Sequence, residues 1–247
     1  MQLVSAYATE HRITLGQAAV PPGAGERAAV PALLDGLDLT GCLVTLDAGF
    51  CQKGIAREIR ARDAGYLRRL HAAVRAWFEA RCIAGGAPDY LPADDSADAG
   101  HGRLVRRRVF VCRDLDALPG LRAWPDVRAV LAVETIRGHR RGRFATTREV
   151  RHFLTSAGPD AVRLGRAVRN HWRVENGLHR VLDVGFGEDA CRVRERRAAR
   201  NLAGLRRIAL HLARADHARS ASLRRKRKQA AWDDTYMAQL IQADIMR

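Results

Sequence analysis

The sequence predicts an α/β fold, because its first 65 residues alternate short strand patterns with short helix patterns. Residues 2–8 and 12–20 predict two strands joined by a polar turn, as in a β-hairpin. Residues 30–39 place apolar side chains at helical spacing, and residues 42–50 form an apolar run that is typical of a central strand buried on both faces. With a further helix expected over residues 52–64, the order is strand, strand, helix, strand, helix.

Asp47 is expected at the carboxyl end of the strand over residues 42–50. In open α/β sheets, ligands and catalytic groups collect at the carboxyl ends of the strands. An aspartate in this place is equally typical of a residue that caps the helix or turn that follows. Position alone therefore leaves both interpretations of Asp47 open.

The middle of the chain is expected to be rich in strands. The pattern predicts a helix over residues 64–82 and an exposed linker, rich in Gly, Pro and Asp, over residues 83–103. Three strands then follow, at residues 104–112, 127–136 and 148–157. Residues 83–158 are therefore interpreted as a β-rich insert or as a continuation of the sheet.

Helices are predicted in the C-terminal third. The longest helix is expected over residues 158–184, and another over residues 196–216. The second helix is expected to turn five residues inward: Leu202, Leu205, Ile208, Ala209 and Leu212. A short apolar helix then follows the basic run RRKRK at residues 224–228.

The chain carries a large excess of positive charge. Lys and Arg number 43 against 27 Asp and Glu, so the net charge is +16. Such a charge favours a polyanionic partner, most simply nucleic acid. The alternative is a compositional bias, because only three of the 43 cations are lysines. The basic run at residues 224–228 is likewise either a solvated face or a surface for phosphate groups.

Cysteine spacing and hydropathy exclude several protein classes. The five cysteines are odd in number and scattered, so neither a disulfide framework nor a zinc knuckle is indicated. No segment has the pattern of a signal peptide or the length of a membrane span. We therefore expect a cytoplasmic protein without a membrane partner.

Four polar residues recur at a spacing of four in the helix predicted over residues 158–184: His171, Glu175, His179 and Asp183. Residues four apart are neighbours on an α-helix, so these side chains would form one stripe. A charged stripe at the edge of a core needs compensation, which a divalent cation can supply. The alternative is a salt-bridge ladder with three arginines of the same helix, Arg169, Arg173 and Arg180.

Three kinds of site chemistry could use such a helix. The His-Glu-x-x-His order of zinc hydrolases is absent. An aromatic content of 6% and a strongly basic chain suit a sugar site poorly. Two-metal phosphoryl transfer requires carboxylates from separate elements, and Asp47 with Glu175 would meet that requirement.

Several ordered blocks of the sequence resemble one family. The segments HWRVENGLHRVLDVGFGEDACRVR, ARNLAGLRRIALHLAR and SLRRKRKQAAWDD are similar to the C-terminal part of bacterial insertion-sequence DDE transposases, of the group that includes the H-repeat-associated proteins. Upstream, QLVSAYATEHRITLGQAAV, VPALLDGLDLTGCLVTLDAGFCQKGIAREI, GYL and HGRLVRRRV resemble further blocks of the same family in the same order. The resemblance covers nearly the whole chain.

The resemblance implies a ribonuclease H-like fold, a mixed sheet flanked by helices in which three carboxylates bind two Mg²⁺ ions for DNA strand cleavage and transfer. Asp47 matches the second carboxylate and Glu175 the one on the closing helix, so both are implied metal ligands and catalytic residues. His171 and Asn176 are implied as supporting residues. The expected DNA-binding residues are Arg169, Arg173, Arg224, Arg225, Lys226, Arg227 and Lys228.

The sequence also departs from the family pattern. In this family the first aspartate lies in an Asp-Gly-Lys segment before the equivalent of residues 2–8, and residues 1–247 do not contain it. A Lys-Gly-Asn-Gln block is missing after Leu67, and Val105 and Arg180 stand where a glutamate and an aromatic residue are expected. We therefore expect an N-terminally truncated, catalytically impaired transposase.

Its catalytic domain is expected over residues 1–215, followed by a basic helical tail over residues 216–247. The expected partners are double-stranded DNA at insertion-sequence ends and, in an oligomer, itself or an intact transposase. The expected location is the bacterial cytoplasm, with association to the nucleoid when the protein is bound to DNA. One alternative is a non-catalytic DNA-binding protein that regulates or joins an intact transposase, and another is a nuclease completed by the aspartate of a second chain.

Overall fold

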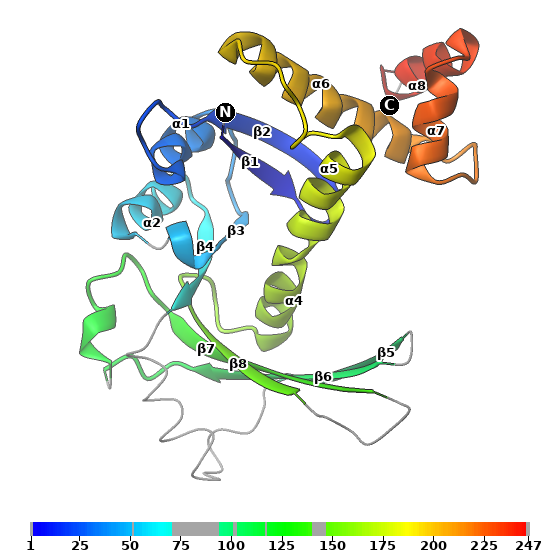
Figure 1. The fold of residues 1–247 in the computed structure, drawn as a ribbon. Helices are drawn as coiled ribbons and strands as arrows, with labels where there is room; N and C mark the ends of the chain where they lie inside the picture. The colour runs from blue at the N-terminus through cyan, green and yellow to red at the C-terminus, as the bar shows by residue number, and fades with distance from the viewer. Residues whose placement is uncertain are drawn as a thin grey trace. The chain divides into compact units, whose positions relative to one another are not determined.

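The computed structural model describes residues 2–50, 52–70, 94–100, 103–116, 118–139 and 147–245 (Figure 1). The chain divides into two compact units. Unit 1 comprises Met1–Leu37 and Trp172–Arg247, and unit 2 comprises Asp38–His171.

Unit 1 is built around the predicted N-terminal hairpin. Strands β1 (Leu3–Ala8) and β2 (Ile13–Ala19) pair antiparallel and form a two-stranded sheet. A 3-10 turn and helix α1 (Val30–Asp35) follow. Gly16 of β2 allows α1 to approach closely, because a Cβ atom there would lie 3.3 Å from Leu33 Cδ1. The hairpin and the first helix are therefore confirmed.

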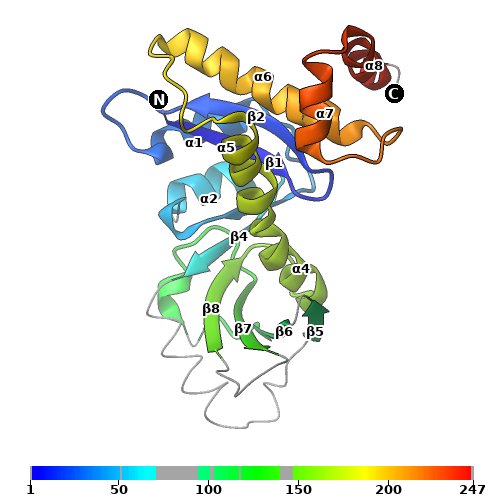
Figure 2. The same cartoon turned by 45° about the vertical axis from the view of Figure 1, so that its right-hand side comes forward.

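The rest of unit 1 is helical. Its elements are a π-helical turn (Glu175–His179), α5 (Arg180–Phe186), α6 (Arg196–Ala215), α7 (Leu223–Ala230) and α8 (Asp234–Ile245). Helix α6 runs alongside β2, as Figure 2 shows. Leu178, Leu182 and Leu210 form the buried cluster between the π-helical turn, α5 and α6. A two-stranded sheet is marginal alone, so this packing is what stabilises the hairpin.

The buried side of α6 differs from the prediction. Leu205 and Ile208 are 61% and 57% exposed, whereas the residues of α6 that are buried are Ala203, Arg207, Leu210 and Ala213. Small residues bring the helix close to the hairpin, since a Cβ on Gly204 would lie 3.3 Å from Gln17 Nε2. The prediction failed because close packing on β2 selects the side of α6 that carries Ala203 and Gly204, which leaves Leu205 and Ile208 exposed.

The long helix predicted over residues 158–184 is interrupted. Helix α4 (Ala161–His171) is followed by the π-helical turn and α5, and the 20-residue α6 is longer than any of these. The polar residues that the prediction placed on one helix therefore belong to separate elements.

Unit 2 contains a six-stranded mixed sheet with the strand order β3-β4-β8-β7-β6-β5. The strands are β3 (Leu43–Leu46), β4 (Gly65–Leu70), β5 (Asp94–Gly100), β6 (Arg103–Cys112), β7 (Ala129–His139) and β8 (Thr147–Thr155). β3 and β4 are parallel and the other neighbours are antiparallel. Helices α2 (Lys53–Arg60) and α4 pack on this sheet, so the predicted mixed sheet flanked by helices is confirmed.

Helix α4 covers one face of the sheet (Figure 1). Leu164 and Val168 of α4 pack in a cluster with Leu131 and Phe153 of the strands. Gly165 makes this approach possible, since a Cβ there would lie 2.9 Å from a methyl group of Val109. The carboxyl-terminal end of α4 is thereby fixed on the sheet beside β3.

Two predictions for unit 2 are wrong in part. Residues 65–70 form strand β4 and not a helix, because hydrogen bonding to both β3 and β8 overrides the local helical pattern. Residues 94–100, expected as linker, form β5, where Arg106 of β6 forms two hydrogen bonds with Asp95. Residues 71–82 and 83–93 of these predictions lie outside the described residues.

The strand that precedes Asp47 also differs from its prediction. β3 is half-buried along its whole length and, among the strands described, it stands at the edge of the sheet. It is neither central nor buried on both faces. The strands expected over residues 104–112, 127–136 and 148–157 are confirmed as β6, β7 and β8.

Candidate functional site

Asp47 is exposed and directly follows β3. Its Oδ1 accepts a hydrogen bond from the backbone N–H of Ala48 at 2.6 Å, at the start of the 3-10 turn Ala48–Phe50. The side chain thus caps the turn, as one of the two interpretations expected. An ionised carboxylate has about four acceptor sites, so this single bond leaves the group able to bind a cation.

A side-chain hydrogen bond ties β3 to the end of α4. Thr45 Oγ1 and His171 Nδ1 lie 3.0 Å apart, and His171 is the last residue of α4. A hydroxyl group either donates or accepts, so the bond is compatible with both imidazole tautomers. Thr45 lies two residues before Asp47, and alternate strand residues share a face. The sequence reasoning missed Thr45, because a threonine inside an apolar run carries no functional signal.

Glu175 begins the π-helical turn, which is closed by a hydrogen bond from the backbone N–H of Arg180 to the carbonyl oxygen of Glu175. Glu175 and the neighbouring Asn176 are both exposed. A π-helical turn contains more residues than an α-helical turn, so side chains four apart across it do not form a regular stripe. Turns of this kind occur frequently at functional sites, which makes the placement of Glu175 informative.

The predicted salt-bridge ladder is not found in the described part of the chain. Neither Glu175 nor Asp183 has an ion pair with a described residue, although both are exposed. The alternative interpretation of the stripe as a salt-bridge ladder is therefore wrong for both carboxylates within these residues. His179 and Arg180 are also exposed, so this side of the segment is a polar surface and not a paired network.

The basic run of α7 divides into exposed and buried cations. Arg224, Arg225 and Lys228 are exposed, whereas the guanidinium of Arg227 lies 5.1 Å from the centre of the Phe186 ring. Lys226 is only 6% exposed and would be a poor phosphate contact. Two further DNA-binding candidates, Arg169 and Arg173, are exposed as well.

Lys226 takes part in a buried network with Asp216 and Tyr236. Its ammonium lies 3.3 Å from Asp216 Oδ2 and also donates to the Asp216 carbonyl oxygen, and the Tyr236 hydroxyl donates to the same carboxylate at 2.7 Å. Burial by itself would raise the pKa of Asp216, but the hydrogen bonds from Tyr236 and Lys226 outweigh it and lower that pKa. The network therefore joins the end of α6 to α7 and α8.

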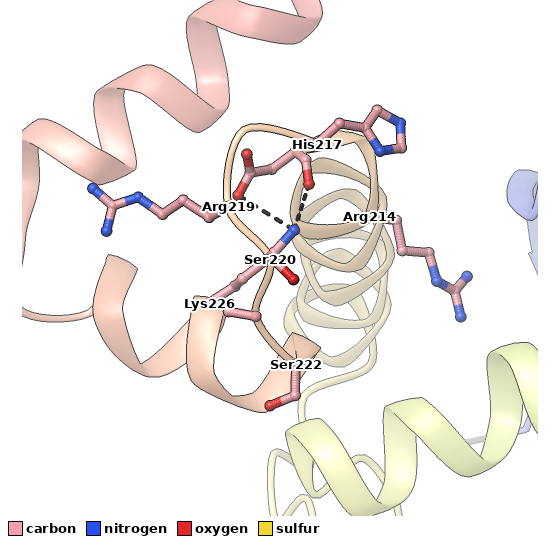
Figure 3. Close-up of a pocket in the computed structure, with 8 residues that line it drawn as sticks. Arg214, His217, Arg219, Ser220, Ser222 and Lys226 are labelled. Carbon is pink, nitrogen blue, oxygen red and sulfur yellow. Dashed lines mark hydrogen bonds and ion pairs between the residues drawn. The ribbon is translucent and has the colours of Figure 1, made fainter.

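A shallow cavity of ≈ 520 Å³ lies at the loop between α6 and α7 (Figure 3). Figure 3 shows that Lys226 points toward its hydrogen-bond partners, whereas the side chains of Arg214 and Arg219 point away from each other. The Arg219 guanidinium lies 4.4 Å from the centre of the Tyr236 ring. These cations already contact protein groups and so stabilise the loop. The cavity is therefore not a preformed anion-binding site.

The family implies bound Mg²⁺, and the donor groups of the described residues meet only part of what this ion requires. Carboxylate oxygens are the ligands that Mg²⁺ prefers, and Asp47 and Glu175 both present an exposed carboxylate. Within the described ranges, no group of three or more His, Cys, Asp or Glu residues is placed to hold a metal ion. The structure thus offers two candidate ligands, one in each unit, without a complete ligand cluster among the residues it describes.

None of the described helices is long and apolar enough to cross a membrane.

Comparison with known proteins identifies the family. The model of the transposase DDE domain matches residues 1–212, which include both candidate carboxylates. The chain belongs to the DDE transposase family. Its mixed α/β architecture agrees with the ribonuclease H-like fold that the resemblance implied, so this fold prediction is confirmed. The match ends close to the predicted domain boundary at residues 215 and 216, and that boundary stays a prediction.

The relatives agree with this family. The chain is 32% identical over 250 residues to the H repeat-associated putative transposase YhhI of Escherichia coli (strain K12), with 98% of this chain and 65% of YhhI covered. It is 30% identical over 249 residues to the putative transposase YncI of Escherichia coli O157:H7, with 98% of this chain and 63% of YncI covered. The chain thus spans somewhat less than two thirds of the length of these curated relatives.

Proposed function

We propose that this chain supplies Asp47 and Glu175 as two of the three metal-binding carboxylates of an insertion-sequence transposase, and that the 247-residue chain is catalytically impaired by itself. The observation that carries the proposal is the family match over residues 1–212, a range in which both carboxylates are exposed. His171 and Asn176 would support the site, as their places beside these motifs imply.

The aspartates before Asp47 do not replace the first carboxylate of the family. Asp35 ends helix α1, and the Asp38 carboxylate accepts a hydrogen bond from the backbone N–H of Thr40 at 3.1 Å. The same bond lowers the pKa of Asp38, as is common for a capping group. Neither residue lies on a strand, so neither has the position that the family requires.

The impairment follows from charge and geometry. When bound, two divalent ions would stabilise the charge of the phosphoryl-transfer transition state. Asp47 and Glu175 would neutralise only half of the positive charge of two such ions and would fix fewer of their ligand positions. Phosphoryl transfer depends on positioning and charge stabilisation, so we expect a large loss of rate.

DNA binding is the second part of the proposal. Exposed Arg224, Arg225 and Lys228 lie on one side of α7, and the chain has a net charge of +16. Cations that neutralise DNA phosphates release counterions, so binding should weaken strongly as salt is raised. A chain that binds DNA without cutting it would act as a regulator or partner of an intact transposase, which is the alternative function.

The test is metal-dependent nicking of supercoiled DNA. Six proteins are compared with Mg²⁺ or Mn²⁺: the chain, a chain extended by an upstream Asp-Gly-Lys segment of the family pattern, and the Asp47→Ala and Glu175→Ala variants of each. We expect the 247-residue chain to bind DNA in a salt-sensitive manner without nicking it. The extended chain should nick DNA and should lose that activity with either alanine.

Two results would contradict the proposal in different ways. Nicking by the unextended chain that both alanine variants abolish would show a working site and would overturn the impairment. Nicking by the extended chain that survives Asp47→Ala or Glu175→Ala would remove that carboxylate from the site.

A further inference from the structure

Arg214 of α6 makes three hydrogen bonds around the segment that carries Glu175. Its Nη2 donates to the carbonyl oxygen of Gly177, the third residue of the π-helical turn. Its Nη1 donates to the Tyr7 hydroxyl at 3.3 Å and to the carbonyl oxygen of Arg12 at 3.0 Å. One guanidinium thus joins α6, the β1–β2 hairpin and the π-helical turn, all within unit 1.

The π-helical turn needs such a partner. Where a helix changes from the α-helical to the π-helical pattern, its hydrogen-bond ladder is interrupted and some carbonyl groups lose their regular donor. A buried carbonyl without a donor costs free energy. The guanidinium presents five N–H groups in a rigid fork, so it can serve the Gly177 carbonyl and two groups of the hairpin together.

Gly177 fits this arrangement because it has no side chain. A Cβ atom at this position would lie 3.0 Å from the Tyr7 hydroxyl oxygen. Tyr7 packs against the buried cluster of Leu178, Leu182 and Leu210, so it has little room to withdraw. The hairpin and Arg214 therefore both contact the π-helical turn at Gly177, its third residue.

We infer that Arg214 is a positioning residue for Glu175: its guanidinium holds the π-helical turn in the conformation that buries Leu178 and leaves the Glu175 carboxylate exposed. The inference rests on the proposed role of Glu175 as a metal ligand. Arg214 acts through the backbone at Gly177 and does not itself bind metal or DNA. Its charge is already engaged by Tyr7, Arg12 and Gly177.

The test compares Arg214→Lys with Arg200→Lys in the full chain. Lysine keeps the charge but cannot form the fork, and Arg200 is an exposed residue of the same helix. Two quantities are measured: hydrogen exchange of the amides of residues 175–179, and the apparent Mn²⁺ dissociation constant from paramagnetic broadening of the Asn176 amide signal. Neither measurement requires DNA cleavage.

We expect Arg214→Lys to speed exchange in the π-helical turn and to raise the apparent Mn²⁺ dissociation constant about tenfold, as is typical when the support of a ligand is removed. Arg200→Lys should change neither quantity. Tyr7→Phe removes only the 3.3 Å bond, so it should shift both quantities in the same direction by about threefold or less. If Arg214→Lys does not fold, Tyr7→Phe tests the positioning role of Arg214 in its place.

The outcomes separate this inference from the proposed function. If Glu175→Ala leaves the Mn²⁺ broadening unchanged, Glu175 is not a ligand and the proposed function fails. If Glu175→Ala abolishes the broadening while Arg214→Lys, or Tyr7→Phe in its place, behaves like the parent chain, only the inference is overturned. Equal effects of Arg214→Lys and Arg200→Lys would also overturn it, since they would reflect general charge.

Discussion

Asp47 follows a four-residue strand at the edge of the sheet formed by the described strands, whereas Glu175 begins a turn that lies on a buried leucine cluster. β3 is half-buried, and Thr45 supplies its side-chain hydrogen bond to α4. Beside Glu175, by contrast, Leu178 is 1% exposed. Segments with few buried contacts open at low free-energy cost, and well-packed segments open only with the whole domain. We therefore expect local motion to displace Asp47 more readily than Glu175.

The largest effect is expected from the leucine cluster. Leu182 is fully buried, so Leu182→Ala should lower the free energy of unfolding by about 2–5 kcal/mol. Leu43→Ala in half-buried β3 should cost clearly less, because less apolar surface is lost. Urea denaturation of the two variants and the parent measures both values. Equal losses of unfolding free energy would mean that β3 is packed as firmly as the π-helical turn. The expected difference in stability between the two segments would then be wrong.

Alkaline pH should loosen unit 1 selectively. Burial, together with the hydrogen bond to Asp216, raises the pKa of Tyr236 to about 12. A tyrosine in an unfolded chain has a pKa near 10. The neutral hydroxyl is thus favoured by the fold, so its stabilising contribution is complete below about pH 10 and is lost as the pH rises toward 12.

Tyrosinate absorbance during a pH titration checks this expectation. Tyr236 should ionise late, so its part of the absorbance change should be missing in Tyr236→Phe. Hydrogen exchange should increase in α7 and α8 over the same range, while the amides of β3 keep their protection. Ionisation of Tyr236 near pH 10 would contradict the buried network. Simultaneous loosening of β3 would contradict the expectation that the change is confined to α7 and α8.

The smallest effect is expected at Thr45. Thr45→Val keeps the shape but removes the hydroxyl group that bonds to His171, so it should cost about 1 kcal/mol and should speed amide exchange in β3. Thr45→Ser should retain most of the protection. Thr135→Val is the matched control, since Thr135 is a half-buried strand residue of β7 whose hydroxyl has no described partner. Equal exchange in Thr45→Val and the parent would show that β3 does not depend on this bond.

Local patterns predicted the elements that depend on neighbours in sequence. The hairpin, α1, β3 and α2 were all expected in the right order, because turn residues and apolar periodicity are local signals. β4 was predicted as a helix because its two sheet partners lie elsewhere in the chain. The inward side of α6 was wrong for a similar reason, since the hairpin selects which side packs.

The candidate site shows the same division. Asp47 and Glu175 were assigned through ordered motifs that resemble a family, not through spacing, which had suggested a stripe that the π-helical turn disrupts. The roles of Thr45 and Arg214 were missed, because their hydrogen-bond partners lie 126 and 37 residues away in the sequence. No local sequence pattern indicates contacts of this kind. Lys226 appeared equivalent to its neighbours in the basic run until the fold placed Asp216 beside it.

The π-helical turn also determines how this segment would respond to the loss of a residue. In a regular α-helix each residue contributes about 100° of rotation, so a deletion turns every later side chain by that amount. A π-helical turn is closed by i→i+5 instead of i→i+4 hydrogen bonds and so holds about one residue more. Deletion of Gly177 would therefore convert the turn into a regular α-helix and would leave Leu182 on the side of Leu210. What the deletion would remove is the carbonyl group to which Arg214 donates, while the leucine cluster stayed in place.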